Sequence, residues 1–259
     1  MSGRARTRRL KKSDIDDGQE SRRCRRNRLY RLRLSRSPGG FSTCRDRILG
    51  QGMAGTTILE QAAAGRATIV PWTVEQYHRA IAAALLPEDA AVELIDGFIV
   101  HKDRASAGED PMTIGDRHRV AILRLAQLAP LFEPLKCFLQ TQQPISLPPL
   151  NEPEPDAAVV RGSIDDYLEH PPGATDVSCV IEVADSSLSL DEGPKLAAYA
   201  GASIAQYVVV DLVNNRVLNH EQPVGNLYAR VISSVRGETV QLSTGGRQHI
   251  SMAVDRLLP

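Results

Sequence analysis

The sequence predicts a mixed α/β (or α+β) domain, with a central mixed β-sheet flanked by helices and a C-terminal β-meander. Two observations carry this prediction: amphipathic helical patterns dominate the front of the chain, and short apolar segments typical of strands dominate its second half. The 259 residues, 42% of them hydrophobic, can bury a core of this size.

The front half predicts two helices separated by a hairpin. The first helix begins after Thr73, an N-cap candidate, and ends before Pro87. The segment AVELIDGFIV then alternates around Asp96-Gly97, a dipeptide suited to a tight turn between strands. A second amphipathic helix follows over residues 113–130.

The second half predicts a sheet with one crossover helix. Strands are expected in the segments KCFLQTQQPISLPP, EPEPDAAVV and DVSCVIEVA, and a surface loop, with room for one helical turn, over 161–175. Pro194 opens a short helix, and a hairpin turning at Asn214-Asn215 follows it. Two more strands, LYARVISSV and ETVQLST, precede a short terminal segment.

Charge divides the chain into two parts. Residues 1–50 hold 16 Lys and Arg against 5 Asp and Glu, and the remainder holds 15 against 26, although the net charge of the whole is zero. We expect residues 1–65 to be a basic, disordered N-terminal extension and residues 66–259 to form the domain. The extension is interpreted as an arm for phosphate backbones, as a solvated tail, or as an upstream sequence if Met53 is the true start.

Other sequence features indicate in which cellular compartment the protein is expected. The four cysteines are scattered without a CxxC pair, so neither a zinc site nor a disulfide framework is predicted. No apolar run approaches the roughly 20 residues of a membrane span, and the basic N-terminus lacks the apolar core of a signal peptide. We expect a cytoplasmic protein of bacterial type, without a membrane partner.

One carboxylate stands out in the predicted sheet. In the strand VSCVIEVA, alternation places Glu182 on the same face as Val180 and Ala184, in otherwise apolar surroundings. A buried carboxylate needs a partner or a cation, and Asp156, at the start of a neighbouring strand, is the natural companion. Two hard oxygen donors suit Mg²⁺ or Mn²⁺. The alternative is that Glu182 caps a sheet edge or pairs with an arginine.

A resemblance adds to this pattern. The segments ELIDG, EPEPDAAVV, VIEVADSSLSLD, GPKLAAYAGA and QYVVVDL, with His118 in the second helix, occur in the order typical of one family. From about residue 73 to residue 259, the chain resembles the restriction endonuclease family often called Uma-two, a branch of the PD-(D/E)xK nuclease superfamily. The resemblance implies a restriction-endonuclease-like core.

The resemblance also implies the roles of individual residues. Pro155-Asp156 and Glu182-Val183-Ala184 match the superfamily motif, except that Ala184 stands where the motif has a lysine. The family pattern implies that Lys195, in the first turn of the following helix, replaces that lysine; otherwise Lys195 is a solvated surface residue.

Two further residues match the family pattern. Glu93 matches an additional acidic residue of the site, able to hold a second ion or act as a base, and is otherwise a carboxylate at a strand end. His118 matches a common histidine and is otherwise a surface or capping residue. Asp185 is a remote candidate ligand.

The implied function is a divalent-metal-dependent endonuclease acting on double-stranded DNA, with a homodimer as the implied assembly. Asp156 and Glu182 would hold the ion, and Lys195 would orient the attacking water or neutralise charge on the phosphate. Two alternatives stay open: a non-catalytic nucleic-acid or protein interaction module on the same fold, and a hydrolase of another phosphate ester. The net charge of −11 over residues 51–259 argues against a simple nucleic-acid binder.

Overall fold

The computed structural model describes residues 57–86, 91–102, 115–185, 187–246 and 248–259. The chain divides into two compact units, Met1–Ile69 and Val70–Pro259. Among the described residues of the first unit, α1 (Ile58–Ala63) begins with a capping box between Thr57 and Glu60. The predicted basic extension falls mostly outside the described residues, and it stays a prediction together with its boundary at residue 65.

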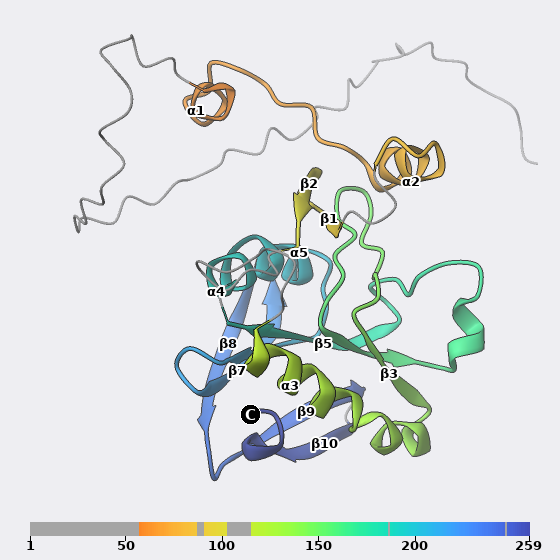
Figure 1. Ribbon diagram of the computed structural model, residues 1–259, viewed down its shortest axis with the longest axis vertical. Coiled ribbons are helices and arrows are strands. Elements are labelled where there is room, and N and C mark those ends of the chain that lie inside the picture. Colours follow the sequence, from red (N-terminus) through yellow and green to blue (C-terminus); the bar gives the residue numbers. More distant parts are fainter. Residues whose placement is uncertain (1–56, 87–90, 103–114, 186, 247) are drawn as a thin grey trace, which may run out of the picture. The chain divides into compact units, whose positions relative to one another are not determined.

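A six-stranded mixed sheet forms the centre of the second unit (Figure 1). All neighbouring strands are antiparallel except β5 and β6, which are parallel and therefore need a crossover connection. In spatial order the strands are β3 (Cys137–Thr141), β4 (Ala157–Arg161), β5 (Val177–Ala184), β6 (Gln206–Asp211), β7 (Arg216–Val224) and β8 (Leu227–Val235). The predicted fold class, a central mixed sheet with a C-terminal meander, is confirmed.

The crossover between β5 and β6 is helical but longer than predicted. It starts with α4 (Leu188–Leu190), continues through a π-helical turn (Asp191–Lys195) that is kinked at Gly193, and ends with α5 (Leu196–Gly201). We predicted that Pro194 opens this helix. Gly193 is non-helical and separates two helical segments, so Pro194 does open the segment that continues into α5, and the additional helical segment over 188–192 precedes it.

Both faces of the sheet are covered by apolar side chains, as the alternation along β5 predicts. Cys179, Ile181 and Val183 pack in one cluster with residues of α3 (Asp116–Ala126) and of the C-terminal strands. Val180 and Ala184 pack in a second cluster with residues of α5. All eight residues of β5 are buried, so Glu182 lies on a strand without solvent-exposed positions.

The predicted front helix and hairpin are confirmed. Helix α2 (Val74–Ala82) begins with a capping box between Thr73 and Gln76. The hairpin pairs β1 (Val92–Ile95) with β2 (Phe98–His101). Gly97 at its turn has a φ of +76°, and an added Cβ would lie 2.3 Å from the Cβ of Pro71, so only glycine fits there.

The C-terminal region contains one strand that we did not predict. The terminal segment forms β10 (Gln248–Ala253), which pairs with β9 (Thr239–Gly245) in a separate two-stranded sheet. The meander therefore ends at β8. The other short elements are 3₁₀ turns, including Ile164–Tyr167 in the predicted surface loop and three more at Ala129–Leu131, Glu133–Leu135 and Val254–Arg256.

Within the described part of the chain, no helix has the length and apolar character that crossing a membrane requires.

A buried histidine on β7 makes the stability of the fold depend on pH. The ring of His220 stacks on Tyr207 and lies beside Tyr228, and within the described residues neither ring nitrogen has a hydrogen-bond partner. Burial lowers the pKa of His220 below its ordinary value of 6.5. Its neutral form therefore contributes stability that is present above that value and is lost as the pH falls toward the lowered pKa.

We expect His220→Phe to reduce the loss of unfolding free energy between pH about 7.5 and about 5.5, by up to about 1.4 kcal/mol per pH unit. Urea denaturation of the wild type and the variant at both pH values measures the difference. His249→Phe, at an exposed position on β10, is the control and should leave the pH dependence unchanged. Equal pH dependence in wild type and His220→Phe would refute the prediction.

Candidate functional site

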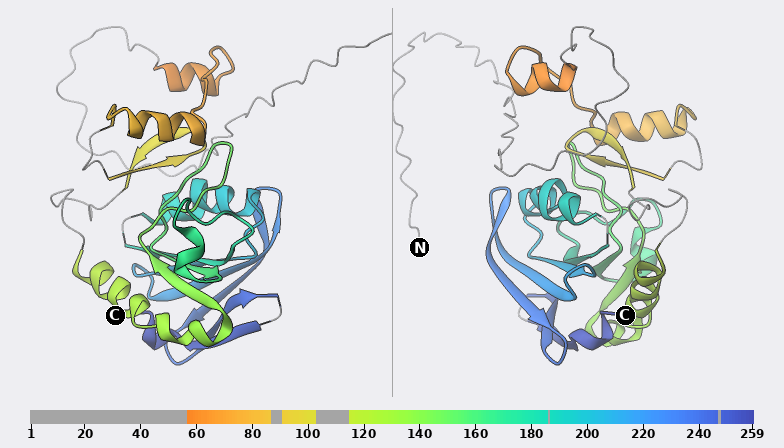
Figure 2. Two further views of the ribbon diagram at one scale, coloured as in Figure 1. Left: turned by 90° about the vertical axis from the view of Figure 1, so that its right-hand side faces the viewer. Right: turned by 60° about the vertical axis from the view of Figure 1, so that its left-hand side comes forward.

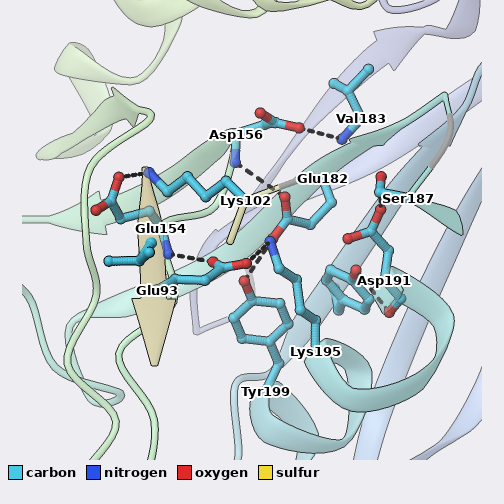
Figure 3. Close-up of polar contacts among 12 residues, drawn as sticks. Glu93, Lys102, Glu154, Asp156, Glu182, Val183, Ser187, Asp191, Lys195 and Tyr199 are labelled. Carbon is cyan, nitrogen blue, oxygen red and sulfur yellow. Dashed lines mark hydrogen bonds and ion pairs between the residues drawn. The ribbon is translucent and has the colours of Figure 1, made fainter. Parts of the chain in front are cut away.

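Two of the predicted carboxylates lie side by side at the junction of β4 and β5. Asp156 immediately precedes β4, which runs antiparallel to β5 with Ala157 opposite Ile181. The backbone N–H of Asp156 donates to Oε2 of Glu182 at 3.3 Å, and the backbone N–H of Val183 donates to Oδ2 of Asp156 at 2.8 Å. The register of the two strands thus brings the carboxylates together (Figure 3).

Glu182 is buried and held by two donors from the crossover. Its Oε1 accepts hydrogen bonds from Nζ of Lys195 at 3.1 Å and from Oη of Tyr199 at 2.7 Å. Because β5 lies inside the sheet, Glu182 does not cap a sheet edge, and its charged partner is a lysine instead of an arginine. Both alternatives that we considered for this residue are therefore wrong.

Lys195 links two carboxylates that are far apart in the sequence. Its Nζ lies 3.1 Å from Oε1 of Glu182 and 3.1 Å from Oε1 of Glu93. Only 7% of Lys195 is exposed, which excludes the interpretation as a solvated surface lysine. The residue is the second after the kink at Gly193, so it lies in the first turn of the helical segment that continues into α5, as predicted.

Glu93 joins the hairpin to this cluster. Its side chain is 1% exposed, and its second oxygen, Oε2, accepts the backbone N–H of Glu154 at 3.1 Å. Glu154 in turn forms an ion pair with Lys102, which follows β2. Glu93 is therefore more than a carboxylate at a strand end, because it connects the hairpin, the segment before β4 and the crossover.

Helix α3 contributes His118, which approaches the same carboxylates. Its Nε2 lies 3.1 Å from Oδ2 of Asp156. Burial lowers the pKa of His118, but the hydrogen bond to Asp156 and the charges of Asp156, Asp185 and Asp191 outweigh burial and leave the pKa above its ordinary value. His118 is thus positioned to hold Asp156, while its Nδ1 is buried and has no partner among the described residues.

Asp191 and Tyr199 belong to the cluster although we did not predict them. Asp191 is buried and accepts a hydrogen bond from Oγ of Ser187 at 2.6 Å. Tyr199 follows Lys195 by four positions, which is the spacing of one helix face, whereas the kink at Gly193 separates Asp191 from both. That spacing is a sequence signal that could have identified Tyr199. Asp185, the remote candidate, directly follows β5 and acts on His118 through its charge.

The cluster contains more negative than positive charge. Four carboxyl groups, those of Glu93, Asp156, Glu182 and Asp191, surround one buried lysine and His118. Burial raises the pKa of Glu182 to about 8 and that of Asp191 to about 6; Lys195 lowers both, while the other carboxylates raise them.

For Lys195 itself, burial lowers the pKa, but Glu182, Glu93 and Asp191 outweigh burial and raise it, so the lysine is charged. The raised pKa of Glu182 means that a proton compensates part of the negative charge of this buried site at neutral pH, and a bound cation could take the place of that proton.

The hydroxyl of Tyr199 is expected to stabilise the buried Glu182. Tyr199→Phe removes that donor without changing the packing volume, and we expect it to lower the free energy of unfolding by about 1–3 kcal/mol. Urea denaturation with a chelator present measures this loss. The control Tyr167→Phe removes a hydroxyl that donates to the carbonyl of Arg161 at a more exposed position, and it should cost less. An equal or smaller loss in Tyr199→Phe would contradict the prediction.

Comparisons with known proteins agree on one family and one fold. The model of the Uma2 family, described as "Putative restriction endonuclease", matches residues 74–255. A solved structure from Anabaena variabilis ATCC 29413, described as "a putative nuclease belonging to DUF820", aligns with a TM-score of 0.52 and 14% sequence identity. The alignment covers 72% of this chain and 97% of that one, and at this identity it shows the shared fold. A search of curated proteins found no match. The family model covers most of the chain, and the protein therefore belongs to the Uma2 family.

Proposed function

We propose that the protein is a divalent-metal-dependent endonuclease that hydrolyses phosphodiester bonds of DNA. The observation that carries this proposal is the convergence of Asp156, Glu182 and Lys195 in one buried, carboxylate-rich cluster. Membership of a family described as "Putative restriction endonuclease" supports nuclease chemistry. The metal ion, the DNA substrate and the role of each residue are parts of the proposal.

The donor chemistry of the cluster fits Mg²⁺ or Mn²⁺. These ions prefer hard oxygen ligands, and Asp156 and Glu182 supply carboxylate oxygens on adjacent strands. Among the described residues, no group of three or more His, Cys, Asp or Glu side chains is already arranged as a metal centre. We propose Asp156 and Glu182 as the ligands of a first ion on the strength of their adjacent oxygens, and Glu93 as an additional acidic residue able to hold a second ion or to act as a base.

The two oxygens of Glu182 have different partners, which supports this assignment. Oε1 is occupied by Lys195 and Tyr199, whereas Oε2 faces Asp156 and accepts only its backbone N–H within the described residues. Oδ2 of Asp156 is likewise held by Val183 and His118, while its Oδ1 accepts no hydrogen bond from the described residues. Oε2 of Glu182 and Oδ1 of Asp156 are thus the oxygens available to a cation.

The chain's own residues would position and stabilise the reaction. A divalent ion, when bound, polarises the phosphate and lowers the pKa of water. Tyr199 and Lys195 fix Glu182, while His118 and the backbone of Val183 fix Asp156. Lys195 carries a charge at neutral pH, so its ammonium can orient the attacking water or stabilise the negative charge that develops on the phosphate.

DNA is the proposed substrate, in its double-stranded form. Because residues 51–259 carry 15 basic against 26 acidic residues, the affinity for phosphate has to come from the bound ion and from basic residues outside this part. The basic residues 1–50 could supply that charge, so binding to DNA should depend strongly on salt.

The decisive experiment measures cleavage of supercoiled and linear DNA by the full chain with Mg²⁺, with Mn²⁺ and with a chelator. We expect cleavage only with metal, and a loss of about 100-fold or more in Asp156→Asn and in Lys195→Met. Calorimetry with Mn²⁺ should show binding by the wild type that weakens in Asp156→Asn, because that variant loses a ligand charge.

Asp255→Asn is the matched control, since Asp255 is an exposed aspartate that pairs with Arg236 far along the chain from the cluster. It should cut and bind metal as the wild type does. If the wild type neither binds metal nor cuts DNA or RNA, the nuclease proposal fails, and the non-catalytic interaction module replaces it.

His118 is proposed to position Asp156. We expect His118→Leu to weaken Mn²⁺ binding and to slow cleavage by about 10–100-fold each, because Asp156 loses the group that orients it. His118→Gln, whose amide can still donate to Asp156, should recover part of the Mn²⁺ affinity and part of the cleavage rate. His170→Leu, at an exposed position, should change neither. Slower cleavage with unchanged metal affinity would argue against a positioning role.

A further inference from the structure

Strand β8 forms an edge of the central sheet. It pairs with β7 on one side, and no strand among the described residues pairs with its other side. The strand has nine residues, and Figure 2 shows it in blue at the margin of the sheet. An open edge of this length presents unpaired backbone N–H and C=O groups, which can pair with another chain.

The features that normally protect an edge strand are missing from β8. Proteins protect such edges with charged side chains, proline or bulges. The strand LYARVISSV contains no proline, and its one charged residue, Arg230, is neutralised within the chain by Glu221. Instead, Leu227, Val231 and Val235 are exposed by 67%, 53% and 49%. This edge therefore presents apolar side chains to solvent.

Strand β9 follows β8 in the chain but does not cover its edge. Among the described residues β9 pairs with β10 alone, and a cleft of about 620 Å³ has both β8 and β9 in its lining. Arg230, Ile232 and Ser234 of β8 line this cleft, whereas Leu227, Val231 and Val235 do not. Alternate positions of β8 thus face the chain's own cleft, and its exposed apolar positions lie on the other face of the strand.

The spacing of the three apolar residues makes the strand complementary to itself. Each is separated from the next by four positions, so a two-fold axis through Val231 places Leu227 of one copy opposite Val235 of the other. The same axis pairs Ala229 with Ser233 and Arg230 with Ile232, so no like charges oppose each other. Such an isologous arrangement is the commonest symmetry of soluble dimers.

We propose that the protein forms a homodimer in which the two β8 strands pair antiparallel about Val231. The two sheets then join into one continuous sheet of twelve strands. Because the axis is perpendicular to the sheet, the face that carries Glu182 in one copy is continuous with the same face of the other copy. The partner proposed here is a second copy of this chain, since the pattern along β8 matches itself.

Sedimentation equilibrium of the full chain tests the interface without depending on any cleavage. We expect the wild type to sediment at twice the chain mass. Val231→Lys places two ammonium groups opposite each other across the axis, and it should weaken the dimer by at least about 100-fold. Val213→Lys is the matched control, because Val213 is exposed by 55% but lies in the turn between β6 and β7. It should leave the dimer intact.

A cross-link provides a second readout that does not rely on a disruptive variant. Residues facing each other across antiparallel strands have Cα atoms about 4.5–5.5 Å apart, within the range of a disulfide. Val231→Cys should therefore give a covalent dimer on mild oxidation in far higher yield than Val213→Cys, which contains the same native cysteines. Three outcomes would overturn the proposal. The wild type could sediment as a monomer, or Val231→Lys could remain dimeric with wild-type thermal stability. Equal cross-linking yields in Val231→Cys and Val213→Cys would be the third.

Discussion

The ion-pair cluster around Lys195 is the interaction on which the rest of the site depends. One ammonium group lies 3.1 Å from Glu93 of the front hairpin and 3.1 Å from Glu182 of the central sheet. Buried carboxylates are costly without compensating charge, and removing one partner of such a pair typically costs about 3–5 kcal/mol. The lysine therefore stabilises both carboxylates in a position where neither would be tolerated alone, and it fixes the hairpin against the crossover.

The backbone determines where this cluster can form. Only β5 and β6 are parallel, so the chain must cross over between them, and the helical crossover covers the face of β5 that carries Glu182. The π-helical turn and the kink at Gly193 place Asp191, Lys195 and Tyr199 along one side of that crossover. Asp191 lies before the kink, whereas Lys195 and Tyr199 lie after it. The irregular turn is thus the feature that gathers the polar groups.

Much of the fold follows from local patterns, whereas the site requires long-range contacts. Alternation along β5 is sufficient to predict that Glu182 lies on a buried face, and the Asp96-Gly97 and Asn214-Asn215 dipeptides are sufficient to predict two hairpins. The contact between Glu93 and Lys195 joins residues about a hundred positions apart, and no local pattern reports it. The separate pairing of β10 with β9 was missed for the same reason, because strand partners depend on the packing of the whole core.

Glu182 combines a structural and a proposed chemical role because its two oxygens are in different environments. Oε1 is occupied by Lys195 and Tyr199, so the position of the carboxylate does not depend on a bound ion. Oε2 points to Asp156, where the strand register leaves a second carboxylate within reach of the same cation. A lysine on the following helical segment can therefore replace one on the strand, because it binds Oε1 of Glu182 and leaves Oε2 beside Asp156. The presence of Ala184 at the strand position is then compatible with a complete set of charged groups, because Lys195 supplies the ammonium from the crossover.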